Sequence, residues 1–310
     1  MINFKIKQIR KDFVMKNESL GIPGNGFEYI KMPSNELGVK GIEARINEFM
    51  GITDFLKEVV FEKGVPEFQG KNKALRFINY GDTQLVYVLE VNDRSYTILL
   101  GQPASEFGIV KRENDNLKRL AKTSSKNVVA PIHYFQSKDG KRELYVTPYI
   151  HQARCIASDD YDGWGVYVPE PDYHFRSFSE DERKVINSSM IALLVKMYDQ
   201  KAKQGIASCK IGGGDFILEK GFEEDTLTHE NILKKMKLIA ARDMVSMSLE
   251  DYIDTLRSEF SKRTYYKTED QRDKSILVNH KSRVPMTHEE IEKGIEIGLK
   301  LRENDKNIQK

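Results

Sequence analysis

Residues 205–221 read GIASCKIGGGDFILEKG, so three consecutive glycines lie between Lys210 and Asp215. Consecutive backbone N–H groups can form a nest that binds an anion, and a carboxylate such as Asp215 can hold Mg²⁺. Glycine is also the residue of tight turns, and a turn between a helix and a hairpin is the alternative interpretation. The fingerprint of a P-loop is absent, because its Lys-Ser/Thr pair follows the glycines and here Asp215 follows them. The pattern favours a structural turn.

A second candidate is Glu113, on the apolar face of a helix predicted over residues 106–122, together with Leu117 and Leu120. A carboxylate at such a position belongs either to an ion pair in a site or to a structural hydrogen-bond network. The six histidines and two cysteines show no metal-ligand spacing. We therefore expect no metal centre built from them.

The elements that must position these residues begin with the clearest strand signal in the chain. The runs QLVYVLEV (84–91) and SYTILL (95–100) are rich in β-branched and aromatic residues, and a tight turn at 92–94 joins them. They predict a β-hairpin. Further strands are predicted over 3–9 and within 128–135 and 142–150, and a further helix over 42–60.

Helices dominate the second half of the sequence. They are predicted over 179–205, 248–260 and 287–299, and the first and last begin with a capping box, at Ser179 and at Thr287. Short buried strands are predicted at 216–218 and 236–240, and the segment 151–178 is predicted to be irregular. This order predicts an α+β fold with a small antiparallel sheet lobe and a larger helical lobe.

The order of these pieces resembles the protein-kinase-like fold, especially its aminoglycoside and choline phosphotransferase branch. Residues 81–121 are similar to the N-lobe of that family, and RELYVTPYI (142–150) to its last N-lobe strand and hinge. KQGIASCKIGGGDFIL (203–218) is similar to the catalytic loop, and MKLIAARD (236–243) to the metal-binding strand end. The resemblance covers about 80–258 and implies an N-lobe over 76–150, a C-lobe over 151–260, and additions at 1–75 and 261–310.

The family implies a mechanism in which a strand lysine pairs with a helix glutamate, an aspartate orients the acceptor hydroxyl, and an asparagine and a last aspartate hold Mg²⁺. The lysine position falls on Leu99 and the glutamate position on Glu113. The catalytic aspartate position falls on Lys210, the metal-binding asparagine on Asp215, and the last aspartate on Ala240. Lysine, base and one metal ligand are therefore missing.

This degenerate, pseudokinase-like pattern predicts a nucleotide-sensing or scaffold protein without ordinary kinase activity. If a nucleotide binds, we expect ATP, held by hinge contacts at Thr147 and Tyr149 and without a need for Mg²⁺. We also expect Lys210 to form an ion pair with Asp215, with Glu113 as the alternative partner, since a buried lysine without a partner is costly. The alternatives are an atypical small-molecule or protein phosphotransferase that uses ATP, and a structural subunit of a larger assembly.

A second register of the catalytic loop places Asn231 in the metal position and Thr226 in the base position. We prefer the first register, because Gly205 follows the long helix directly, as the catalytic loop does in the family. Asp243, three residues after Ala240, is an alternative metal ligand.

Composition limits the remaining functions. The 310 residues carry 49 basic and 47 acidic side chains, a net charge of +2, so neither a nucleic-acid nor a membrane partner is expected. No run approaches the length of a membrane span, the N-terminus lacks the apolar core of a signal peptide, and the two cysteines show no disulfide pattern. We therefore expect a cytoplasmic protein.

Three segments, 1–75, 151–178 and 261–310, exceed what the shared kinase-like core needs. Their presence favours a protein partner or a homo-oligomer.

Overall fold

A computed structural model describes residues 51–70, 73–80, 84–102, 108–151, 153–159, 163–168, 174–208, 213–222, 226–261 and 286–308. The chain divides into two compact units. Unit 1 contains residues up to 111 together with 131–149, and unit 2 contains 112–130 and the residues from 150 onward. The strand predicted over 3–9 and the first part of the helix predicted over 42–60 lie outside the described residues.

Unit 1 is built on a five-stranded antiparallel sheet in the order β1-β2-β3-β5-β4. The strands are β1 (Lys73–Tyr80), β2 (Gln84–Val91), β3 (Arg94–Gly101), β4 (His133–Gln136) and β5 (Glu143–Pro148). The predicted hairpin is confirmed, since β2 and β3 pair from Gln84 with Gly101 to Val91 with Arg94. Asn92 in its turn has a φ of 53°, a left-handed conformation that asparagine tolerates.

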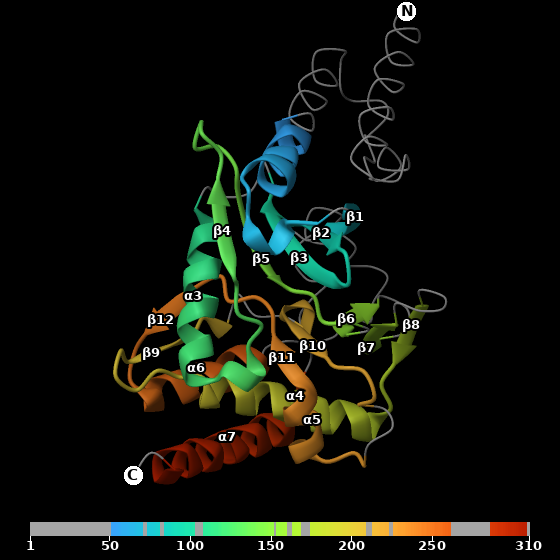
Figure 1. The fold of residues 1–310 in the computed structure, drawn as a ribbon. Coiled ribbons are helices and arrows are strands. Elements are labelled where there is room, and N and C mark those ends of the chain that lie inside the picture. The colour runs from blue at the N-terminus through green and yellow to red at the C-terminus, as the bar shows by residue number, and fades with distance from the viewer. Residues whose placement is uncertain are drawn as a thin grey trace, which may run out of the picture. The chain divides into compact units, whose positions relative to one another are not determined.

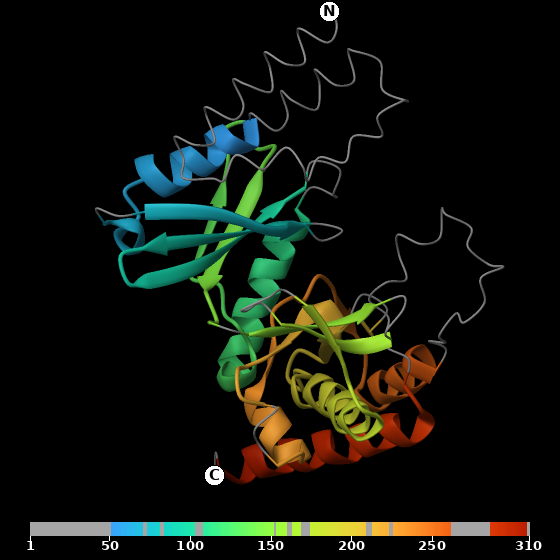
Figure 2. The ribbon, with the colours of Figure 1, turned by 90° about the vertical axis from the view of Figure 1, so that its right-hand side faces the viewer.

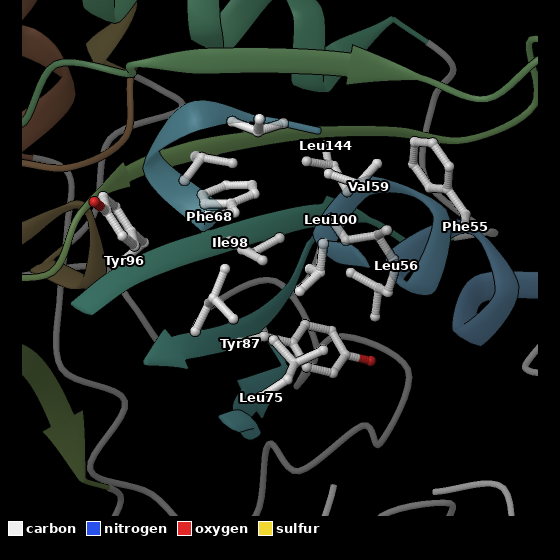
Figure 3. Close-up of a cluster of buried hydrophobic side chains, with 14 of the residues drawn as sticks. Phe55, Leu56, Val59, Phe68, Leu75, Tyr87, Tyr96, Ile98, Leu100 and Leu144 are labelled. Carbon is white, nitrogen blue, oxygen red and sulfur yellow. The ribbon is translucent and has the colours of Figure 1, made fainter. Parts of the chain in front are cut away.

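One face of this sheet carries the core of unit 1. A helix runs from residue 51 and continues as η2 (Glu58–Glu62), and the single turn η3 (Pro66–Phe68) follows it. Figure 3 shows side chains of this helix, including Leu56 and Val59, beside Ile98 and Leu100 of β3. Because side chains alternate along a strand, Leu99 lies on the opposite face of the sheet.

Unit 2 is organised around α4 (Glu180–Lys196), whose residues from Ile186 to Val195 are all buried. The predicted capping box is confirmed, with the Ser179 hydroxyl accepting from the Glu182 N–H and the Glu182 carboxylate accepting from the Ser179 N–H. Figure 2 shows α4 between the strands of unit 2 and α7 (His288–Ile308). A helix covered on all sides must carry apolar or small residues all round, as this one does. It ends at Lys196, with Met197 as its C-cap, before the predicted end at Gly205.

A second five-stranded sheet, in the order β11-β10-β6-β7-β8, packs in unit 2. Its strands are β6 (Arg154–Asp159), β7 (Gly163–Val168), β8 (His174–Ser177), β10 (Phe216–Leu218) and β11 (Met236–Leu238). The prediction that residues 151–178 are irregular is therefore wrong. They form an antiparallel meander, and its first strand pairs with β10, far away in the sequence.

The remaining elements of unit 2 complete its frame. They are α3 (Ile109–Thr123, of which residues 112–123 belong to unit 2), η4 (Ser125–Asn127), β9 (Gln204–Ile206), η6 (Gly213–Asp215), α5 (His229–Lys235), β12 (Met244–Ser246) and α6 (Leu249–Ser261). β9 and β12 form a two-stranded antiparallel ribbon. The helices predicted over 106–122 and 248–260 correspond to α3 and α6.

α7 is an integral part of unit 2. A Cβ atom on Gly294 would lie 2.5 Å from the carbonyl oxygen of Ser188, and one on Gly298 would lie 2.6 Å from the Cβ of Val195, so only glycine allows this approach to α4. Arg302 donates to carbonyl oxygens at the end of α4, among them that of Lys196 at 3.3 Å. Figure 1 shows the two helices side by side. The C-terminal addition predicted at 261–310 thus supplies part of the core.

The architecture is α+β, as predicted, with a five-stranded antiparallel sheet in unit 1 and helices concentrated in unit 2. The hairpin β2–β3, helix α3, strand β5, helix α4, strand β9, hairpin β10–β11 and strand β12 follow one another along the chain. This is the order of the protein-kinase-like fold that the resemblance predicts. Within the described ranges, no helix combines the length and the apolar character needed to cross a membrane.

Candidate functional site in unit 2

Asp215 is the buried carboxylate of the candidate site. It ends η6 and leads directly into β10, and its backbone carbonyl accepts from the Ile239 N–H at 2.8 Å. Its side chain is 4% exposed and forms an ion pair with Arg242, with Arg242 Nη1 3.0 Å from Asp215 Oδ1. The antiparallel register of β10 and β11 brings these two residues together, because the start of β10 lies beside the end of β11.

The segment 239–243, which follows β11, is held by α3. The Asn116 side chain donates to the carbonyl oxygen of Ala241 at 2.8 Å and to that of Arg242 at 3.3 Å. Arg112 Nε lies 3.6 Å from Asp243 Oδ1, and the Asp243 carbonyl accepts from the Ala207 N–H. Since its carbonyls and one carboxylate are held, the backbone that carries Arg242 is fixed.

The metal positions implied by the resemblance do not fit a divalent cation. Asp215 is already paired with a guanidinium, and Ala240, buried in the second position, offers no ligand atom in its side chain. Within the described part of the chain, no three His, Cys, Asp or Glu side chains gather in a way that could hold a metal ion. We therefore derive no chemistry through Mg²⁺ at this site.

The predicted partner of Asp215 was Lys210, which lies outside the described residues. The structure gives Asp215 the partner Arg242, which sequence reasoning missed. The available signal was that Arg242 comes two residues after the strand predicted at 236–240, which pairs with the strand following Asp215. Glu113, the predicted helix glutamate, is fully buried on α3.

The glycine run is described in part. Gly213 and Gly214 belong to the 3₁₀ turn η6, and neither has a positive φ. An anion nest alternates right- and left-handed residues, so these two glycines do not form one. A Cβ on Gly214 would meet no atom within 4 Å. The described part of the run is a turn into β10.

The alternative register places its candidates at the start of a helix. The Thr228 hydroxyl accepts from the backbone N–H of Asn231 at 3.2 Å and caps α5. The Asn231 side chain donates to the Thr226 carbonyl at 3.0 Å. The Asn231 side chain is thus engaged at the N-terminus of α5, which favours the first register.

The remaining predicted residues lie in unit 1. Leu99 is buried in β3, where it is paired with Val86 and Tyr145. Thr147 is buried in β5, and the backbone N–H of Tyr149 donates to the carbonyl of a β3 residue at 3.1 Å. Because that N–H is engaged within the sheet, a nucleotide contact at Tyr149 would have to use another group.

No protein-family model matches the chain, and no curated protein matches it. Among solved structures, WaaP in complex with acyl carrier protein matches with a TM-score of 0.37 and 11% identity, over 78% of this chain and 90% of that chain. An apo pseudokinase structure matches with a TM-score of 0.37 and 13% identity, over 75% of this chain and 87% of that chain. The kinase-like assignment rests on the order of the elements described above.

Proposed function

We propose that this protein is a pseudokinase, a kinase-like domain that acts as a nucleotide-sensing or scaffold protein and does not transfer phosphate with Mg²⁺. The ion pair between Asp215 and Arg242, at 3.0 Å, carries the proposal. In the preferred register Asp215 takes the metal-binding position. A guanidinium stays protonated at every physiological pH, so the carboxylate is permanently neutralised by a protein cation.

Phosphoryl transfer depends mainly on positioning and on neutralising the charge of the phosphates. A divalent cation at Asp215 would have to approach the Arg242 guanidinium, and the two positive charges would repel each other. The alanine at position 240 supplies no second carboxylate to offset this repulsion. The pair therefore favours a metal-free state of the site.

The test is ATP turnover by the full chain with Mg²⁺, compared between the wild type and Asp215→Ala. We expect no Mg²⁺-dependent turnover in either protein, and nucleotide affinities in calorimetry that are equal with Mg²⁺ and with EDTA. Asp254→Ala, which removes an exposed carboxylate on α6, is the control variant. Turnover that needs Mg²⁺ and is lost only in Asp215→Ala would refute the proposal.

An atypical ATP-dependent phosphotransferase is the second candidate, and Asp243 is the observation that favours it. Its carboxylate is 37% exposed, and its contact with Arg112 is long, at 3.6 Å, so it is more open to a cation than Asp215. This candidate predicts Mg²⁺-dependent turnover that is lost in Asp243→Ala and retained in Asp215→Ala.

A scaffold role requires a partner, and we propose a protein partner or a second copy of the chain. Light scattering on the purified chain and co-purification from its native source test this. A monodisperse monomer without associated protein would favour nucleotide sensing over scaffolding.

A further inference from the structure

The two helices α6 and α7 enclose an apolar groove on unit 2. The groove has a volume of about 360 Å³. It is lined by four aliphatic side chains and bordered by two charged ones: Leu249, Ile253, Ile295 and Leu299, with Glu250 and Arg257. An apolar cavity of roughly 150 Å³ holds a benzene molecule, so this groove has room for more than one aliphatic side chain. A groove of this kind is a typical docking site for a segment of protein with apolar anchor residues.

An ion pair closes one end of the groove. Arg257 Nε lies 2.7 Å from Glu292 Oε1, and Arg257 Nη2 lies 3.0 Å from Glu292 Oε2. From this pair the groove extends towards the start of α6 and towards the end of α7. The two helices are therefore antiparallel. The end of α6 at Ser261 and the start of α7 at His288 both lie at the closed end of the groove.

The segment that joins these two helix ends has the length needed to enter the groove. Residues 262–285 contain one run of three consecutive aliphatic residues, Ile-Leu-Val at 276–278. Leu299, the groove residue on α7 farthest from the closed end, lies eleven residues after His288, about 17 Å along the helix. Seven residues, 279–285, follow the run before Met286, and seven residues of extended chain span about 23–25 Å. The run can therefore reach every residue that lines the groove.

Charge also favours this segment as the occupant. Helix α6 carries four carboxylates and one basic residue, and among the exposed carboxylates is that of Glu250, which borders the groove. Residues 262–285 carry seven Lys or Arg and three Asp or Glu. Two of the basic residues, Lys274 and Lys281, flank the aliphatic run. A basic segment is thus attracted to the acidic side of the groove and aligned on it.

We propose that the segment 262–285, which lies outside the described residues, docks its aliphatic run at 276–278 in the groove between α6 and α7 of the same chain. The aliphatic side chains of the run pack against those of the groove, and Lys274 and Lys281 face the exposed carboxylates of α6. The docked run covers apolar surface that the two helices leave open. The proposal is independent of the state of the Asp215 site, because it involves only α6, α7 and the segment that joins them.

Hydrogen exchange of the full chain, measured by mass spectrometry, tests the proposal. We expect the amides of residues 276–278 to exchange about tenfold or more slowly than their intrinsic rates, because a docked segment is less open to solvent. Leu299→Asp places a charge in the groove and should return these amides to their intrinsic rates. Asn304→Asp adds the same charge at an exposed position of α7 outside the groove and should leave the protection unchanged.

A second pair of variants changes only the segment, so its result does not depend on whether Leu299→Asp folds. The double variant Ile276→Ser/Val278→Ser removes apolar anchors of the run and should abolish the protection. The double variant Tyr265→Ser/Tyr266→Ser removes the other pair of large apolar side chains in the segment and should leave the protection in place.

Free exchange of residues 276–278 in the wild type overturns the proposal, and light scattering then identifies the other occupant. A dimer that Leu299→Asp dissociates would assign the groove to a second copy of the chain, and a monomer would leave it for a separate protein. Protection that survives Leu299→Asp also overturns the proposal. So does protection that falls when the protein is diluted, because a contact within one chain does not depend on concentration.

Discussion

Replacing Arg242 by alanine should destabilise unit 2 by about 3 kcal/mol, because it removes a cation that is paired with a buried carboxylate. The Asp215 side chain is 4% exposed and the Arg242 side chain 28% exposed. Breaking a buried ion pair costs about 3–5 kcal/mol, and the lower end applies here because solvent screens a partly exposed guanidinium. Urea denaturation at pH 7 measures the change in the free energy of unfolding.

The double variant Asp215→Asn/Arg242→Ala removes the buried carboxylate charge together with the arginine. We expect it to recover at least about 1 kcal/mol relative to the sum of the two single variants, as a double-mutant cycle for contacting charges should show. Additive losses would refute the reasoning.

Three further predictions concern the packing of α7. Gly294→Ala places a Cβ atom 2.5 Å from the Ser188 carbonyl and should cost about 1–3 kcal/mol in chemical denaturation, whereas Gly214→Ala, with open space around it, should change little. Arg257 donates to both oxygens of Glu292, at 2.7 and 3.0 Å, and this bond lowers the pKa of Glu292, so its stabilisation is present at neutral pH and lost as the pH falls below the ordinary value of 4.5. Glu292→Gln should therefore cost about 0.5 kcal/mol at pH 7 and less at pH 3 in thermal melts, and an equal cost at both would contradict the assignment. Removing α7 should abolish the cooperative melting of unit 2, as circular dichroism would show.

Elements specified by local chemistry were predictable. The hairpin β2–β3 follows from β-branched runs around a short turn, and the starts of α4 and α7 follow from their capping boxes. In each case the residues that fix the element are within a few positions of one another. The glycine run was also predicted as a turn, and its described part is one.

Elements specified by distant partners were not predictable. The strand β6 is stabilised by pairing with β10, and β10 follows it only after the whole of α4. The pairing of Asp215 with Arg242 was missed for the same reason, since Arg242 reaches it only through the register of β10 and β11. The close packing of α7 is an exception, because the four-residue spacing of Gly294 and Gly298 is a pattern typical of a helix that packs closely on another helix.

The position of α4 between the second sheet and α7 has a consequence for synthesis on the ribosome. All residues of unit 1 have been translated once residue 149 is made. In contrast, one apolar side of α4 stays uncovered until α7, the last described helix, has left the exit tunnel. Throughout that interval the nascent chain displays the surface that Gly294 and Gly298 will cover. Unit 2 therefore folds only after α7 has been translated. A chaperone that binds apolar helices can bind the nascent chain during this interval.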